Sequence, residues 1–306
     1  MSELEIIRHR QIDGISIFFD AVEYRTPHFH SEWELIWITD GDLQIGCGGQ
    51  RFSGKKGDLF LFYPNQLHEF RTAGGEAVFL CLQISPQVFA SAYPELRTVA
   101  VKSCVVSEFC CESQKTALRM EMRSLLQEYL DRKPYYELRC ISRAAEIMAS
   151  LLSVAPAYRL SEEELSSADK RNARLSRFLN YADENYMHKI SLAEFAEAEG
   201  CTVSYMSRFL KQNLNQTFQE YINMIRYHSA CRLIRSGRMR LLDVCEEVGF
   251  SDYRYFSSCF RKECGMTPEE YRRRTELPDQ GPGPRSLYSV ERFFTREESY
   301  TRLRSL

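Results

Sequence analysis

Residues 241–272, LLDVCEEVGFSDYRYFSSCFRKECGMTPEEYR, carry the most informative local pattern in this chain. Apolar residues recur there at intervals of three and four, the spacing of an amphipathic helix. Gly249 supplies a permissive turn between two helical stretches, and Asp252 can cap the helix that follows. The stretch therefore predicts a short helix, a turn and a second helix.

The same pattern occurs about fifty residues earlier in the chain. At an offset of 49, Leu192, Phe195, Ala196 and Gly200 match Leu241, Val244, Cys245 and Gly249. After one inserted residue, Thr202, Tyr205, Met206, Leu210, Lys211, Thr217 and Tyr221 match Asp252, Tyr255, Phe256, Phe260, Arg261, Thr267 and Tyr271 at an offset of 50. Because a solenoid needs about three repeats or more, two copies predict a pair of helix-turn-helix units.

The outer face of the second helix of each unit is predicted to contact DNA bases, because this helix enters the major groove. Met206, Leu210, Phe256 and Phe260 are expected to face inward. The predicted base-reading residues are Ser204, Ser207 and Arg208 in the first unit, and Tyr253, Arg254, Ser257 and Ser258 in the second. Arg208 is the residue best suited to bidentate contact with guanine. The alternative is that these polar side chains only form a solvated helical face. This alternative explains any single residue better than it explains the duplicated pattern.

Phosphate contacts are predicted around these helices. Basic side chains suit phosphate oxygens, and so do the backbone N–H groups at helix starts. The residues expected to make such contacts are Lys211, Thr217, Arg261, Lys262 and Thr267.

Four segments of the same region resemble the signature of the AraC/XylS family of bacterial transcription regulators. They are Gly249-Phe-Ser-Asp-Tyr-Arg-Tyr-Phe256, Cys259-Phe-Arg-Lys262, Gly265-Met-Thr-Pro268 and Tyr271-Arg272. The resemblance covers roughly residues 171–275 and implies two helix-turn-helix units joined by a long helix, here about Phe218 to Ser236. Ser258 stands where family members often have Arg, so either Arg254 compensates or the second unit anchors mainly on phosphate.

The first hundred residues carry the pattern of β-strands. The segments ISIFFDAVEY, WELIWITDGDLQIGC, GDLFLFYP and EAVFLCLQIS are short, rich in β-branched and aromatic residues, and separated by turn residues. They predict an antiparallel barrel or sandwich. From about residue 112 the period becomes helical, with apolar positions at Leu118, Met122, Leu125, Leu126, Tyr129, Ile141, Ala144, Ala145, Met148, Leu151 and Leu152.

The motif His28-Phe-His30-Ser-Glu-Trp-Glu34, with Gly41, resembles the first motif of the cupin barrel. Gly57 to Pro64, with His68, resembles the second motif more loosely, because Gln66 stands where glycine is typical. His28 and His30 share one face of a strand. With Glu34 and His68 they are candidate ligands of a divalent metal, but the favoured interpretation is a metal-free effector pocket. Its predicted residues are His28, His30, Glu34, Trp37, Tyr63 and His68.

The predicted fold class is α+β, with a cupin-like antiparallel barrel plus helices first and an all-α double helix-turn-helix domain last. The predicted divisions are an effector-binding barrel at 1–108, a helical dimerisation segment at 109–155, a linker at 156–170, the DNA-binding domain at 171–276 and a tail at 277–306. The tail begins with a turn-rich break and continues with aromatic and basic residues, a composition compatible with docking on the protein or binding a partner.

Composition and charge fit this division. The chain has 306 residues, a net charge of −2 and 44% hydrophobic residues, which excludes a disordered or fibrous protein. Residues 170–276 hold 18 Lys and Arg against 14 Asp and Glu, a charge of +4, so the remainder carries −6. Eleven cysteines without a metal or disulfide spacing predict reduced thiols. The charged start of the chain and the lack of an apolar span predict a cytoplasmic location, away from the membrane.

The sequence therefore predicts a DNA-binding transcription regulator whose barrel senses a small molecule, such as a sugar or related metabolite. The expected partners are double-stranded DNA, the effector, a second copy of the chain and RNA polymerase. No catalytic residue and no cofactor are predicted. The alternatives are a metal-dependent cupin enzyme fused to a DNA-binding domain, and a regulator that needs no effector.

Overall fold

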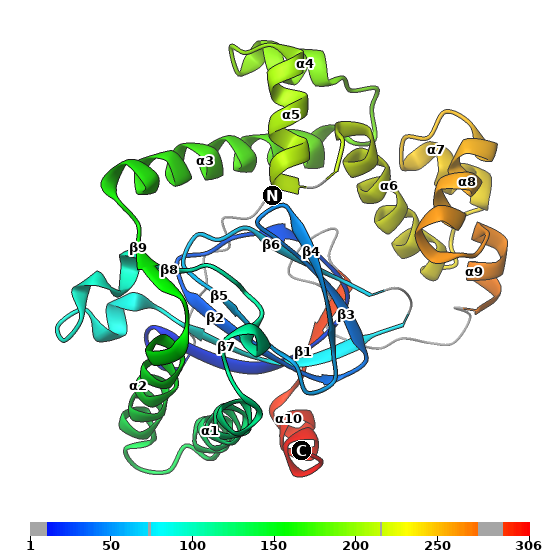
Figure 1. Cartoon of the computed structure of the whole chain (residues 1–306). Helices are drawn as coiled ribbons and strands as arrows, with labels where there is room; N and C mark the ends of the chain where they lie inside the picture. Colours follow the sequence, from blue (N-terminus) through cyan, green and yellow to red (C-terminus); the bar gives the residue numbers. More distant parts are fainter. Residues whose placement is uncertain (1–10, 73–74, 215, 275–289) are drawn as a thin grey trace.

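The computed structural model of the chain describes residues 11–72, 75–214, 216–274 and 290–306. In Figure 1 a barrel of strands occupies the centre, with helices α1, α2 and α10 below it and helices α3 to α9 above and to the right. The molecule thus has the predicted α+β organisation, a β-barrel followed by a helical C-terminal part.

The barrel is built from one antiparallel sheet. Its strands follow the order β4-β3-β6-β1-β7-β2-β5, and β10, from the tail, also pairs with β1. The bounds are β1 Ile15–His28, β2 Trp33–Asp40, β3 Asp42–Cys47, β4 Gln50–Lys55, β5 Leu59–Phe62, β6 His68–Arg71, β7 Ala77–Ile84 and β10 Val290–Phe293. β-branched and aromatic residues favour such strands, and the predicted antiparallel barrel is confirmed.

Side chains of the sheet alternate between its two faces. On β2, Trp33, Leu35 and Trp37 join a core cluster that the sheet shares with the helices below it. Ile36 and Ile38 join another cluster, made of barrel and adjoining loop residues, which fills the interior. Neighbouring residues of one strand therefore pack in different hydrophobic cores.

Two antiparallel helices cover the outer face of the sheet. They are α1 Glu112–Asp131 and α2 Tyr136–Val154, and the short elements before and after them are η1 Pro86–Phe89, η2 Pro94–Thr98, β8 Val99–Val101, η3 Val106–Glu108 and β9 Ala157–Arg159. Leu118, Met122, Leu125 and Leu126 of α1 are buried. Ala144, Met148 and Leu151 of α2 are buried as well, so the helical pattern in the sequence marks the face that packs on the barrel.

The linker predicted for residues 156–170 is wrong for most of its length. Residues 157–159 form β9, which pairs with β8, and helix α3 begins at Glu162 and continues to Asn185. Ser161 caps this helix, since its Oγ accepts from the N–H of Glu164, whose carboxylate accepts from the N–H of Ser161. This capping box starts a helix in a polar segment.

The C-terminal part contains the two helix-turn-helix units. The first is α4 Leu192–Ala198 and α5 Val203–Leu214, and the second is α7 Leu241–Glu247 and α8 Tyr253–Cys264; α6 Phe218–Arg235 joins them and α9 Pro268–Arg274 follows. Gly200 and Gly249 have φ of +63° and +87° at the two turns, a conformation that favours glycine. Thr202 and Asp252 cap α5 and α8 through the N–H groups of Tyr205 and Tyr255. The predicted pair of units is confirmed.

The helical part packs against the barrel. The ring of His228, on α6, is stacked on Tyr24 of β1 with centroids 4.0 Å apart. Arg71 of β6 pairs with Glu263 of α8 at 3.3 Å. The β3–β4 turn approaches the end of α5 so closely that a Cβ on Gly49 would lie 2.4 Å from the carbonyl oxygen of Gln212. The barrel therefore touches both helix-turn-helix units.

The tail returns to the barrel. β10 pairs with β1, and α10, Arg296–Arg304, lies beside α1, where Tyr300 donates to Asp131 at 2.9 Å. Leu303 is buried in the core shared with α1. The turn-rich break expected at the start of the tail lies outside the described residues, whereas residues 290–306 dock on the protein.

The cysteines agree with the expectation of reduced thiols. All eleven are free and seven of them are buried. The seven buried cysteines fill apolar positions as small hydrophobic side chains do.

Candidate DNA interface and effector site

The outer face of α5 presents the three residues predicted to contact bases in the first unit. Ser204, Ser207 and Arg208 are exposed, whereas Met206 and Leu210 on the opposite face are buried. Burial of the apolar face anchors the helix and fixes which side chains point to solvent. The first unit therefore offers a polar, basic surface of the kind that enters a major groove.

The second unit presents a more mixed surface. Arg254 and Ser258 are exposed on α8, but Ser257 and Tyr253 are half-buried. The Tyr253 hydroxyl donates to Glu269 Oε1 at 2.5 Å, and burial raises the pKa of this hydroxyl. Tyr253 is thus tied to α9, which leaves Arg254 and Ser258 as the accessible pair.

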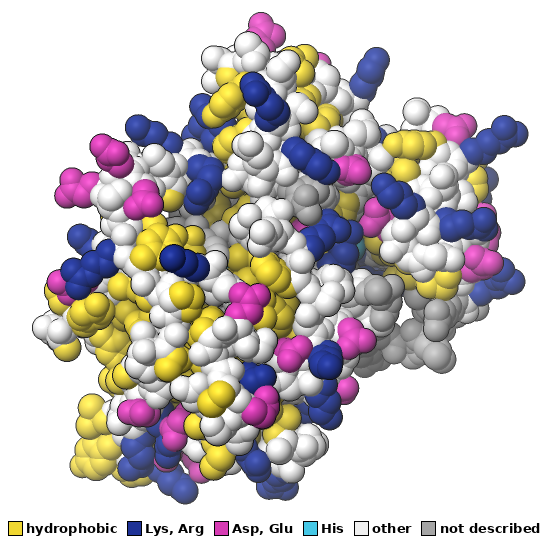
Figure 2. Space-filling view, viewed as in Figure 1, with side chains coloured by type: hydrophobic (Ala, Val, Ile, Leu, Met, Phe, Trp, Pro, Cys, Tyr) yellow, Lys and Arg dark blue, Asp and Glu magenta, His cyan; other side chains and the backbone are white. Residues whose placement is uncertain are grey.

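The predicted phosphate contacts divide into two kinds. Lys211, Arg261 and Lys262 are exposed. Thr217 and Thr267 begin α6 and α9, and their backbone N–H groups donate to Glu220 at 2.8 Å and to Glu270 at 2.7 Å. Because these two carboxylates already occupy the N–H groups, the three basic side chains are the better phosphate donors. Figure 2 shows Lys and Arg side chains spread over the helices above and to the right of the barrel.

Two exposed tyrosines on the recognition helices are not among the predicted DNA contacts. Tyr205 and Tyr255 are 42% and 45% exposed and occupy matching positions of the two copies. Their hydroxyls accept from Arg174 Nη1 at 2.8 Å and from Asn223 Nδ2 at 2.6 Å. The internal repeat already pairs Tyr205 with Tyr255. An aromatic residue that both copies share was therefore the signal in the sequence that could have drawn attention to them.

A cluster of three histidines and one glutamate lies inside the barrel. His28, His30 and His68 are buried, and each offers a ring nitrogen within 4.8 Å of those of the other two. Glu34 Oε2 lies 3.0 Å from His30 Nε2, and its Oε1 lies 3.4 Å from His68 Nε2. His28 ends β1, His30 lies in the connection to β2, Glu34 is near the start of β2 and His68 begins β6. We call this set, with the cavity beside it, the barrel site.

Backbone carbonyls fix two of the rings. Nδ1 of His28 lies 2.8 Å from Thr26 O, and Nδ1 of His68 lies 2.9 Å from Gln66 O. A carbonyl oxygen can only accept, so both Nδ1 atoms carry a proton. Burial, followed by the charges of His68 and Arg25, holds the pKa of His28 well below its usual range. His28 is therefore neutral at pH 7 and its Nε2 carries a lone pair.

Glu34 supplies the negative charge of the barrel site. Burial alone would raise the pKa of this carboxyl, but its contacts with His30 and His68 outweigh burial and hold the pKa well below its usual range. Gln83 also donates to Glu34 Oε2, at 2.8 Å. An ionised carboxylate facing imidazole nitrogens creates a position that suits a proton or a cation.

The residues of the barrel site fit a divalent cation. Three imidazoles and a carboxylate are ligands that Zn, Fe, Mn and Ni accept. The carbonyls on Nδ1 of His28 and His68 are the outer contacts that orient ligating histidines. His28, His30, His68 and Glu34 would hold the cation.

The structure does not bring Trp37 and Tyr63 to the barrel site. Trp37 lies on the opposite face of β2 from Glu34, in the core shared with α1 and α2, and Tyr63 packs against the same core. An odd spacing along a strand reverses the face. The pocket of six residues expected from the sequence is thus a cluster of four.

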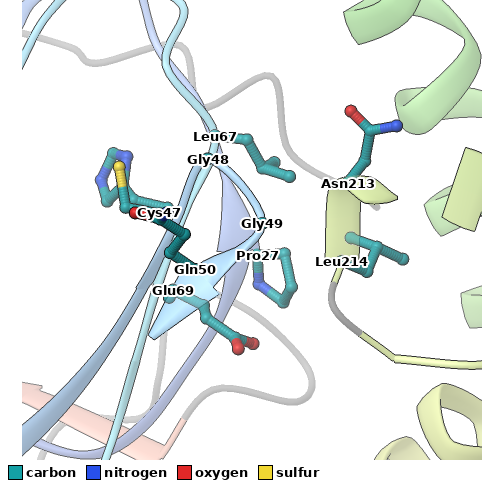
Figure 3. Close-up of a pocket in the computed structure, with 11 residues that line it drawn as sticks. Pro27, Cys47, Gly48, Gly49, Gln50, Leu67, Glu69, Asn213 and Leu214 are labelled. Carbon is teal, nitrogen blue, oxygen red and sulfur yellow. The ribbon is translucent and has the colours of Figure 1, made fainter. Parts of the chain in front are cut away.

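Two small cavities adjoin the barrel site. One, of about 20 Å³, is lined by His28, Glu34, Gln83 and residues of β1, β7 and β10. The other, of about 10 Å³, lies at the mouth of the barrel between the β3–β4 turn and the end of α5, where Gly49 faces Leu214 (Figure 3). Each has room for about one water molecule, so a metabolite enters the barrel site only if part of its wall moves.

Comparison with known proteins agrees with this architecture. A family model described as an AraC-like ligand binding domain matches residues 12–168, and one described as a helix-turn-helix domain matches residues 195–274. No helix among the described residues is long and apolar enough to cross a membrane.

Individual relatives are distant in sequence. The chain is 23% identical to the uncharacterized HTH-type transcriptional regulator YdeC of Bacillus subtilis, over 82% of this chain and 87% of YdeC. It is 22% identical to the HTH-type transcriptional activator RhaS of Pectobacterium carotovorum, over 82% of this chain and 91% of RhaS. Among solved structures it matches ToxT of Vibrio cholerae with a TM-score of 0.38 and 11% identity, over 86% of this chain and 99% of ToxT. The barrel, the paired helix-turn-helix units and the two family matches together show that this chain belongs to the AraC family of DNA-binding transcription regulators and carries an N-terminal ligand-binding domain.

Proposed function

We propose that this regulator binds duplex DNA through α5 and α8 and that a small metabolite received at the barrel site controls how these helices are presented. One observation carries the proposal: the barrel that holds the buried polar cluster also contacts both helix-turn-helix units, through Gly49 and Gln212 and through Arg71 and Glu263. A ligand that favours one arrangement of these contacts over another shifts the population of DNA-binding states.

Within this proposal Ser204, Ser207 and Arg208 read bases in the first half of the target, and Arg254 and Ser258 read them in the second. Lys211, Arg261 and Lys262 hold phosphates. Exposure of these side chains on the two recognition helices supports the assignment. Tyr253 and Ser257 are proposed to contact the edge of the second half-site, since both are half-buried.

Selection of duplexes from random DNA by the purified full-length chain tests the proposal. We expect one enriched motif with two parts about one helical turn apart, because the single helix α6 joins the two units that carry the recognition helices. The matched control is the Ser204→Ala, Arg208→Ala, Arg254→Ala variant, which should enrich no motif. Equal enrichment of all sequences by the unmodified chain would overturn sequence-specific binding.

We further propose that the chain works in the cytoplasm as a homodimer that contacts RNA polymerase. Three apolar side chains on the α1–α2 hairpin support the dimer: Met120, Tyr135 and Leu138 are 63%, 74% and 66% exposed. Pairing of two such hairpins would remove these apolar side chains from water, which favours association. Analytical ultracentrifugation should show a dimer for the unmodified chain and a monomer for the double variant Met120→Glu, Leu138→Glu. A monomer for the unmodified chain as well would contradict the proposed dimer.

We propose that the chain is not an enzyme. The carboxylate of the barrel site is engaged by His30, His68 and Gln83, and the cavity beside it has room for one water. The two full-length relatives described above carry the names of transcription regulators. Turnover of a metabolite that also alters DNA binding would contradict this proposal.

The geometry of the three histidines favours a second candidate, a regulator with a resident divalent cation. Such a cation would supply a Lewis-acidic position for an anionic ligand. Metal analysis of chelator-free protein is the test, with His28→Gln, His68→Gln as the control. About one equivalent in the unmodified chain and none in the variant would support the candidate, and less than about 0.1 equivalent in the unmodified chain would exclude it.

A further inference from the structure

Tyr205 and Tyr255 have the same surroundings in the two helix-turn-helix units. Each is the third residue of its recognition helix. Each hydroxyl accepts a hydrogen bond from the helix that precedes its unit, from Arg174 Nη1 of α3 at 2.8 Å and from Asn223 Nδ2 of α6 at 2.6 Å (Figure 1). Residues 174 and 223 are 49 positions apart, which is the offset of the repeat before its inserted residue. Both copies therefore hold an exposed tyrosine hydroxyl with a donor on a neighbouring helix.

The hydrophobic cores of the units do not require this arrangement. Met206 and Leu210 anchor α5, and Phe256 and Phe260 anchor α8, all of them fully buried. A hydrogen bond at the surface adds little to stability, because water replaces it when it breaks. Its occurrence in both copies therefore points to a role at the surface rather than in folding.

The geometry of the two hydrogen bonds leaves the hydroxyl protons available. A guanidinium can only donate, so Tyr205 is the acceptor, and no described residue accepts its proton. The amide oxygen of Asn223 accepts from Gln219 at 2.9 Å, which turns the amide nitrogen toward Tyr255. The Cys259 thiol also lies within reach of the Tyr255 hydroxyl, but a thiol is a weak acceptor. Both hydroxyls can therefore donate to a stronger acceptor outside the protein.

Positive charge lies beside the Tyr205 hydroxyl. Arg174 and Arg177 share a single carboxylate, that of Glu199, at 3.1 Å and 2.5 Å. Because a guanidinium is always charged, two of them with one carboxylate leave an excess of one positive charge. The guanidinium of Arg174 also lies over the Tyr205 ring, 5.4 Å from its centroid. An anion that accepts from this hydroxyl would therefore gain a favourable electrostatic contact as well.

The place of Tyr205 on α5 favours phosphate over bases. Successive residues of a helix are about 100° apart, which puts Tyr205 about 60° from Arg208 and about 100° from Ser204 around the helix axis. It therefore lies at the margin of the face predicted to read bases. The major groove is about as wide as an α-helix with its side chains, about 12 Å, so the margin of that face meets the phosphates of the groove wall. Tyr255 has the same place on α8.

We propose that the hydroxyls of Tyr205 and Tyr255 each donate a hydrogen bond to one DNA phosphate on the wall of the major groove, held in position by Arg174 and Asn223. The inference rests on the proposed function in taking α5 and α8 as the helices that enter the groove. Because phosphate contacts fix the register of a protein on the duplex, the two hydroxyls set the position of each recognition helix. The contact of Tyr205 is the stronger one, since its neighbour is a cation and that of Tyr255 is a neutral amide.

Methylphosphonate scanning with the full-length chain is the test. The duplex selected from random DNA is prepared with one phosphate at a time replaced by a neutral methylphosphonate, and each Kd is measured. We expect several sensitive phosphates with the unmodified chain. Tyr205→Phe should lose the sensitivity of one phosphate in the first half, worth about tenfold in Kd. Tyr255→Phe should lose a smaller sensitivity at one phosphate in the second half.

Tyr181→Phe is the matched control, because the Tyr181 hydroxyl donates to Glu194 at 3.1 Å between α3 and α4. It should keep every sensitive phosphate. Arg174→Gln should reduce the sensitivity assigned to Tyr205, whereas Arg177→Gln, which removes a charge from the same carboxylate, should keep it. The inference is overturned if both tyrosine variants keep every sensitive phosphate. It is also overturned if they lose all phosphates of a half together, as a loosened recognition helix would.

Binding to a duplex of mixed, unselected sequence separates this inference from the proposed function. A phosphate contact does not depend on sequence, so Tyr205→Phe should weaken this binding by about tenfold, and Tyr181→Phe should not. A chain that enriches no motif but shows this difference would contradict the proposed function and support the inference. A chain that enriches a motif and binds it as tightly after Tyr205→Phe would support the proposed function and overturn the inference.

Discussion

Arg208 illustrates what a single residue contributes on the DNA side. It is exposed on the outer face of α5, whose inner face is fixed by Met206 and Leu210. We expect Arg208→Ala to cost about 1–3 kcal/mol on the selected duplex and to relax preference at one base pair. Titration of duplexes substituted one base pair at a time measures this, and uniform weakening on all of them would make Arg208 a phosphate contact.

Arg261 should behave differently, because it lies exposed at the far end of α8. We expect Arg261→Ala to weaken binding to all duplexes and to reduce the slope of log affinity against log salt by about one unit. Affinity measured at four salt concentrations checks the slope, and a slope equal to that of the unmodified chain would rule out a phosphate contact.

His228 makes the stability of the folded chain depend on pH. Burial, followed by the charges of Arg71 and Arg235, holds its pKa well below the usual range. The unfolded chain therefore binds a proton below about pH 6.5 that the folded chain does not, so stability falls as the pH drops through that value, by up to about 1.4 kcal/mol per unit. Urea unfolding between pH 7.5 and 5.5 should show a shallower dependence in His228→Gln, while His188→Gln, at an exposed position, keeps the original one.

At this scale the sequence predicted part of the barrel site. The sequence motif correctly grouped His28, His30, Glu34 and His68, but the expected reason was wrong for His30, which lies in the connection after β1 rather than on a strand beside His28. The positions of Trp37 and Tyr63 depend on which face of β2 and of its neighbours points inward, a fact of the sheet that no local pattern contains. The buried pair of Arg25 with Glu291 was not predicted, because these two residues lie far apart in the chain.

Among the elements, the turn of the second unit leaves no room for a side chain. A Cβ on Gly249 would lie 2.6 Å from the carbonyl oxygen of Met187 and 2.8 Å from that of Tyr186, and φ is +87°. Gly265, which ends α8 at φ +72°, has open space around it. We expect Gly265→Ala to cost about 1 kcal/mol for its conformation alone and Gly249→Ala to cost about 2 kcal/mol or more. Urea unfolding measures both, and equal losses would show that the contact with residues 186 and 187 is unimportant.

Elements with local signals were predictable, and those without were not. The two helix-turn-helix units follow from their repeated apolar spacing and their glycine turns. The start of α3 was misjudged because a polar segment was taken for a linker, although Ser161 and Glu164 have the spacing of a capping box. Strand β10 has only four residues, and its pairing with β1 depends on a partner some 270 positions away.

At the scale of the whole molecule, the contact between the barrel and α5 can be tested with two neighbouring glycines. Gly48 and Gly49 both have positive φ, +58° and +76°, but only Gly49 approaches another part of the chain, Gln212. We expect Gly49→Ala to separate the turn from α5 and to accelerate hydrogen exchange at residues 212–214. Gly48→Ala bears the same conformational cost and should leave that exchange unchanged; acceleration by both would place the effect in the turn rather than in the contact.

The path of the tail also determines what a label placed on it would report. The tail follows the DNA-binding region in the sequence, but its described residues, 290–306, pack on the barrel side through β10 and α10. A dye attached in α10 would therefore report on the barrel rather than on the DNA.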